Sequence, residues 1–193
     1  MKQNQFGLQL ISLLLLLGIS GTACAHPGHG ASGFGAGFLH PFSGMDHLLA
    51  MLAVGLWAGQ SGTRKLWLLP AVFMSLLVAG AGLAQYFPAL PLIETGIAAS
   101  VLVLGLITAL ALHVPLALSI ALTAVFGLVH GYAHGMEMPG SAAPVLYAVG
   151  FLAATAALHF SGIKLGLAAR GRYSVWTQAA GAAIALSGIW MLS

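Results

Sequence analysis

Long apolar runs dominate the chain, and short polar stretches separate them at nearly regular intervals. A first, shorter run at residues 8–19 follows Lys2 and precedes Ala23-Cys24-Ala25. Six further apolar segments cover residues 40–59, 66–84, 95–113, 116–134, 142–161 and 173–192. Each is close to the roughly 20 residues that an α-helix needs to cross about 30 Å of hydrocarbon. The pattern predicts an all-α polytopic membrane protein with six transmembrane helices.

The N-terminal run has the features of a secretory signal peptide. It combines a basic start, a short apolar core and a small-x-small cleavage sequence ending at Ala25. We therefore predict a cleaved signal peptide at residues 1–25, a periplasmic Gly/His-rich leader at 26–39 and a six-helix transmembrane domain at 40–193. An uncleaved first transmembrane helix and a lipoprotein modified at Cys24 are the alternatives. The leader begins with His26-Pro27-Gly28-His29, which could hold a metal ion loosely or simply be flexible.

Charged residues are rare, and their positions predict the orientation in the membrane. They make up 5% of the chain, against about 25% in ordinary soluble domains. If the mature N-terminus lies outside, every basic residue of the mature chain falls in a cytoplasmic connection: Arg64, Lys65, Lys164, Arg170 and Arg172. This obeys the positive-inside rule and predicts an N-out, C-out topology, with Asp46, Glu94 and Glu137 on the outer side. The expected surroundings are a lipid bilayer, and the scattered basic residues predict no nucleic-acid partner.

Two histidine motifs lie at the ends of the first and fourth predicted spans. Residues 40–47 read His-Pro-Phe-Ser-Gly-Met-Asp-His, and residues 130–137 read His-Gly-Tyr-Ala-His-Gly-Met-Glu. Offsets of four and seven place the second motif's histidines and glutamate on one helix face. Because the first span starts outside and the fourth ends outside, both motifs belong at the same depth. The candidate metal ligands are His40, Asp46, His47, His130, His134 and Glu137.

These residue types favour a divalent transition metal. Ionisable groups in a membrane span are costly and usually pair or face a polar pathway. Imidazole with carboxylate suits nickel, cobalt, zinc or copper, and the loss of Cys24 with the signal peptide would exclude thiolate ligands. His113 and His159 lie near the inner ends of predicted spans. They could belong to an exit route or to the membrane interface, and the interface is the interpretation we favour.

Over essentially its whole length the chain resembles the HupE/UreJ family of bacterial nickel and cobalt permeases, and the matching motifs lie at residues 25–29, 40–51, 54–58 and 130–137. The resemblance implies a six-span permease of the bacterial inner membrane that imports Ni²⁺ or Co²⁺ for hydrogenase, urease or cobalamin assembly, with metallochaperones as partners. The family's metal-binding positions carry over onto the six candidate ligands above. No catalytic residue and no prosthetic group is implied. The sequence contains no ATP-binding loop, so we expect secondary, ATP-independent transport.

Two other protein classes could use the same residues. A membrane-embedded zinc hydrolase would leave one metal position open for water, with Ser43 and Glu137 available for its chemistry. A b-type haem protein would use histidines on facing helices as axial ligands. The permease interpretation requires the opening turn of the first span and the closing turn of the fourth to meet, which the sequence does not show.

Overall fold

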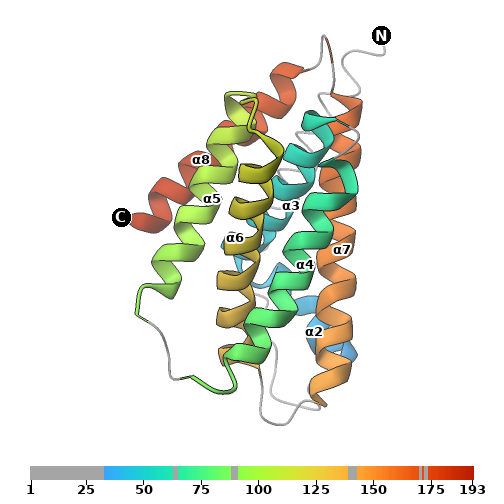
Figure 1. The fold of residues 1–193 in the computed structure, drawn as a ribbon, viewed down its shortest axis with the longest axis vertical. Coiled ribbons are helices and arrows are strands. Elements are labelled where there is room, and N and C mark those ends of the chain that lie inside the picture. Colours follow the sequence, from blue (N-terminus) through green and yellow to red (C-terminus); the bar gives the residue numbers. More distant parts are fainter. Residues whose placement is uncertain (1–32, 63–64, 88–90, 139–142, 170, 172–173) are drawn as a thin grey trace. The chain divides into compact units, whose positions relative to one another are not determined.

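The apolar segments of the sequence form helices in the computed structural model, which describes residues 33–62, 65–87, 91–138, 143–169, 171 and 174–193. The elements are α2 (Phe34–Leu39), the 3₁₀ turn η1 (His40–Phe42), α3 (Met45–Ser61), α4 (Lys65–Leu83), α5 (Ile93–Ala109), α6 (Leu116–Glu137), α7 (Pro144–Ala168) and α8 (Ser174–Leu192) (Figure 1). All regular structure in these ranges is helical, so the predicted all-α class is confirmed. The predicted signal peptide, with His26 and His29, lies outside the described residues.

Helix length and composition identify the candidate membrane spans. Helices α4, α6, α7 and α8 are each long and apolar enough to cross a membrane. The segment Phe34–Phe42 passes the same test together with α3, from which it is bent by 83°. Helix α5 is apolar but has 17 residues. The described residues therefore contain four candidate spans, or five if the bent pair counts as one, while α3 to α8 match the six predicted segments in order.

The bend before α3 has local causes in the sequence. His40 and Pro41 form a 3₁₀ turn, which Ser43 closes by donating from its backbone N–H to the His40 carbonyl at 2.9 Å. Gly44 then adopts an extended conformation, and α3 begins at Met45. A Cβ atom on Gly44 would lie 2.8 Å from the His47 ring. The bend thus lets two histidines of one short motif approach the same space from different directions.

Helix α2 was not expected, because its residues belong to the segment that the sequence analysis assigned to a leader. It packs on α7 (Figure 1). A Cβ atom on Gly37 would lie 1.9 Å from the Tyr147 carbonyl oxygen. A Cβ atom on Gly150 would lie 2.1 Å from the Phe34 carbonyl oxygen. Small residues allow helix backbones to approach this closely. Gly37, one of the glycines that suggested a leader, is therefore a helix contact.

Helix α3 forms the centre of the helix packing. It contacts α4, α5, α7 and α8, and residues 50–59 are all buried. A helix that is apolar all round is expected in such a position. The other main pairs are α4 with α6 and α5 with α8 (Figure 1). A Cβ atom on Gly131 would lie 2.0 Å from the Leu77 carbonyl oxygen, so close α4–α6 packing fixes the helix turn that carries His130.

Candidate metal site

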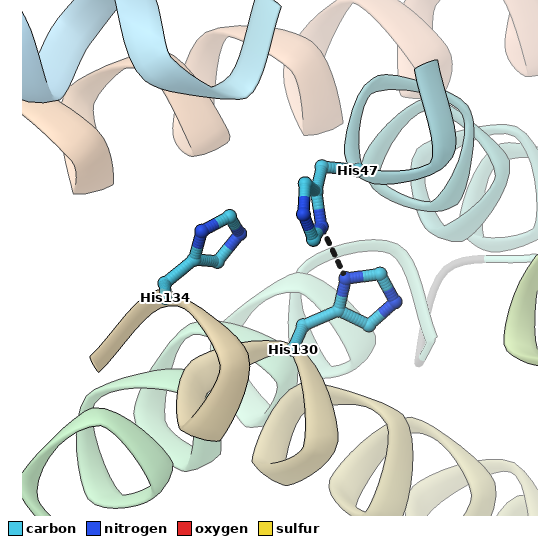
Figure 2. Close-up of side chains that lie close together, drawn as sticks. All are labelled: His47, His130 and His134. Carbon is cyan, nitrogen blue, oxygen red and sulfur yellow. Dashed lines mark hydrogen bonds between the residues drawn. The ribbon is translucent and has the colours of Figure 1, made fainter. Parts of the chain in front are cut away.

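Three buried histidines converge where α3 begins and α6 ends, which we call the histidine end. His47 lies in the first turn of α3, and His130 and His134 lie one turn apart on α6. One ring nitrogen from each lies within 4.8 Å of the other two. Figure 2 shows the three rings facing one another, with His47 Nδ1 3.0 Å from His130 Nδ1. We call these residues the inner triad.

A second group of donors lies next to the inner triad and shares His134 with it. Glu137 Oε2 is 3.1 Å from His40 Nε2 and 3.6 Å from His134 Nδ1. We call His40, His134 and Glu137 the outer triad. Side-chain exposure falls from 47% at Glu137 through 23% at His40 to 3% at His134, and His130 is fully buried. The two triads therefore form a continuous series of donors from the surface into the helices.

Ser100 on α5 orients the deepest histidine. Its Oγ donates to the Ile97 carbonyl at 2.7 Å and lies 2.8 Å from His130 Nε2. A serine hydroxyl has one hydrogen, so Ser100 must accept from His130 Nε2–H. His130 Nδ1 then carries a lone pair directed at the triad. Metal-binding histidines usually donate their second ring N–H to a partner in this way.

Asp46 lies beside His47, much as Ser100 lies beside His130. Its Oδ1 accepts from the His47 backbone N–H at 2.8 Å and lies 3.8 Å from His47 Nε2. This is the ring nitrogen that does not contact His130. Asp46 belongs to neither triad and lies beside the His47 ring. The other five predicted ligands are the members of the two triads.

His134 provides the test of whether these residues fit a metal ion. Its side chain is 3% exposed, and neither ring nitrogen makes a hydrogen bond to a described residue, although the Glu137 carboxylate lies 3.6 Å from Nδ1. Buried polar groups are normally paired, because an unpaired one loses its hydration without replacement. A metal ion between the triads would occupy a His134 lone pair. Imidazole nitrogens with one carboxylate suit a divalent transition metal.

Comparison with known proteins identifies the family of the chain. The model of the HupE / UreJ protein family matches residues 14–191. The chain belongs to the HupE/UreJ family. Protein HupE of Rhizobium leguminosarum bv. viciae is 39% identical to it over 185 residues, which are 95% of this chain and 97% of the relative. No solved structure matches the chain.

The acidic residues of this HupE/UreJ chain gather at the histidine end. Glu94, at the start of α5, and Glu137, at the end of α6, line one cavity of about 320 Å³. Asp46 lies at the same end. Lys65, in contrast, begins α4 at the opposite end, where it lines a different cavity. The described residues thus carry their acidic and basic groups at opposite ends, as the topology predicts.

Sequence reasoning missed several residues of the HupE/UreJ site. Ser100 is one hydroxyl in an apolar run, and no spacing relates it to either motif. Phe151 of α7 covers the triads, with its ring centroid 4.3 Å from that of His134. Tyr147, one turn earlier, lies 5.8 Å from the His40 ring. Only the packing of α5 and α7 against the motifs reveals these contacts.

Proposed function

We propose that the chain is a secondary permease of the bacterial inner membrane that imports a divalent transition-metal ion, Ni²⁺ or Co²⁺. The proposal includes six spans, with α5 and the bent α2–α3 segment each crossing once, and the histidine end facing the periplasm. Its main support is the convergence of the two triads on His134, whose buried ring makes no hydrogen bond to any residue that the structure describes. Membership of the HupE/UreJ family supports it independently.

The proposed transport begins at the exposed carboxylates. Glu94 and Glu137 line the cavity at the histidine end and attract the hydrated cation. His40, Glu137 and His134 then replace part of its hydration shell. Because His134 also belongs to the inner triad, the ion exchanges His40 and Glu137 for His47 and His130 without being released.

The membrane potential supplies the driving force in this scheme. One elementary charge crossing 100 mV gains about 2.3 kcal/mol, so a divalent ion gains about 4.6 kcal/mol. Uptake then needs no ATP. The imidazole-rich donor set binds nickel more tightly than cobalt at a given geometry, so we propose Ni²⁺ as the preferred cargo, delivered to metallochaperones for metalloenzyme assembly.

Uptake by purified protein in liposomes tests the proposal. We expect ⁶³Ni and ⁵⁷Co to accumulate when the interior is negative, and His47→Ala and His134→Ala to abolish accumulation. Ser187→Ala is a suitable control, because Ser187 is half-buried on α8 and its hydroxyl donates within that helix to the Ala183 carbonyl. Correctly inserted wild-type protein that transports neither metal would refute the permease proposal. Hydrolysis of lipid amides or peptides that is lost in His47→Ala would instead indicate the zinc hydrolase.

A further inference from the structure

Some buried side-chain nitrogen and oxygen atoms make no hydrogen bond to a described residue. They occur beside the triads and also farther along α3 and α7. Among the described residues they are Trp57 Nε1, the Tyr147 hydroxyl and the ring nitrogens of His134 and His159. Tyr147 and His134 belong to the region of the triads. His159 does not, yet its side chain on α7 is only 1% exposed. The interface position favoured by the sequence therefore does not describe His159, which is enclosed by helices because α7 continues to Ala168.

One aromatic side chain lies between His159 and the inner triad. The ring centroid of Phe73, on α4, is 5.6 Å from that of His130 and 5.3 Å from that of His159. The Phe73 and His159 rings meet edge to face at 90°. Phe73 is fully buried. The Phe73 ring therefore separates the His159 imidazole from that of His130.

Close helix packing fixes the backbone of His159. A Cβ atom on Gly55 of α3 would lie 2.3 Å from the His159 carbonyl oxygen, and one on Gly162 of α7 would lie 2.4 Å from that of Leu52. The backbone there cannot shift to bring the ring to another partner. Thr155, one turn earlier on α7, is equally buried but donates its hydroxyl to the Phe151 carbonyl at 2.9 Å. The lack of a partner therefore distinguishes His159 from its polar neighbour.

A cavity lies beyond His159 at the end of the helices opposite the triads. It has a volume of about 460 Å³ and is lined by Trp57, Gln60 and Gly166, among others. Gly166 follows His159 by two turns of α7, about 10 Å along the helix axis. Trp57, with its unpartnered Nε1, follows Gly55 on α3. His159 is thus intermediate between the inner triad and this cavity.

We propose that His159 is a transient ligand for the transported metal ion, reached from the inner triad past Phe73 and followed by release into the opposite cavity. This inference rests on the proposed permease function. A neutral imidazole can take one coordination position of a divalent ion. A site with one protein ligand binds weakly, and conduction requires sites that are weak enough for the ion to leave.

The first test replaces His159 with leucine, which fills similar space without a donor. We expect Ni²⁺ binding to the purified protein to stay near the wild-type affinity, because the triads are intact. The initial ⁶³Ni uptake rate in liposomes should fall by about tenfold or more, since the ion loses a ligand that lowers its barrier. His159→Gln, which keeps an oxygen donor, should be intermediate. Thr155→Val is the matched control and should transport normally.

Wild-type uptake by His159→Leu would overturn the inference and leave the permease proposal standing. Absence of uptake by the wild type would instead overturn the permease proposal. Loss of uptake in Thr155→Val equal to that in His159→Leu would show that His159 only packs, and would also overturn the inference.

A second test remains decisive if His159→Leu fails to insert. His159→Cys is prepared with Cys24, the only cysteine of the chain, replaced by alanine. We expect a small thiol reagent to modify the new cysteine and Ni²⁺ to slow that modification. A packing role would not produce protection by metal. Modification at the same rate with and without Ni²⁺, or no modification at all, would overturn the inference.

Discussion

Replacing Ser100 with alanine tests whether the hydrogen bond behind His130 supports metal binding. His130 is fully buried, and its Nε2–H donates to Ser100 Oγ at 2.8 Å. Ser100→Ala removes that acceptor. The ring must then leave Nε2–H unpaired or move the proton to Nδ1. The second response puts a hydrogen where His130 would offer its lone pair to the ion.

Typical energies of such hydrogen bonds set the expected size of the effect. Outer partners of metal-bound histidines typically change metal affinity by about 10- to 100-fold, which corresponds to about 1.4–2.8 kcal/mol. An unpaired buried donor costs about 1–3 kcal/mol of stability. Both losses come from the same bond, so they are not additive. We expect Ser100→Ala to weaken Ni²⁺ binding by about 10- to 100-fold.

Calorimetric titration of the purified protein with Ni²⁺ provides the assay, and the melting temperature monitors folding. Ser100→Thr keeps the hydroxyl and should bind Ni²⁺ like the wild type. Thr108→Val is the matched control, because it removes another buried hydroxyl of α5, one that donates to the Leu104 carbonyl at 2.9 Å. An unchanged affinity in Ser100→Ala, or an equal loss in Thr108→Val, would refute the reasoning.

Three further predictions follow from the same geometry. Gly131→Ala should lower the free energy of unfolding by about 1–3 kcal/mol, because its Cβ would lie 2.0 Å from the Leu77 carbonyl oxygen; an unchanged melting temperature would contradict this α4–α6 contact. Glu137→Gln should slow ⁶³Ni uptake more than it weakens tight Ni²⁺ binding, because Glu137 contacts His40 and His134 but lies outside the inner triad. Equal losses of uptake rate and of Ni²⁺ affinity would argue against two successive sites. At 100 times its Kd, Ni²⁺ should stabilise the wild type by about 2.7 kcal/mol and His134→Ala much less, as measured by thermal unfolding; equal stabilisation would exclude His134 as a ligand.

The helices could be predicted because their cause is local. Apolar runs of membrane-spanning length predict α-helices, and each of the six runs contains one, although α5 ends at Ala109 and leaves residues 110–113 of its run outside the helix. The stripe formed by His130, His134 and Glu137 depends only on helical periodicity, and α6 continues to Glu137 as that stripe requires. Helix α2 could not be predicted in this way. Its residues are glycine-rich, and their helical structure is accompanied by close contact with α7.

The sequence by itself determined the helical class, the two histidine motifs and their common end of the molecule. Only the tertiary structure decided which donors meet, because His47 and His130 are 83 residues apart and approach through the packing of whole helices. The same packing placed Ser100 behind His130 and enclosed His159 beside Phe73. Spacing along one helix fixes which side chains share a face. Which other helix that face meets depends on close backbone contacts, such as Gly131 against Leu77, that no single segment encodes.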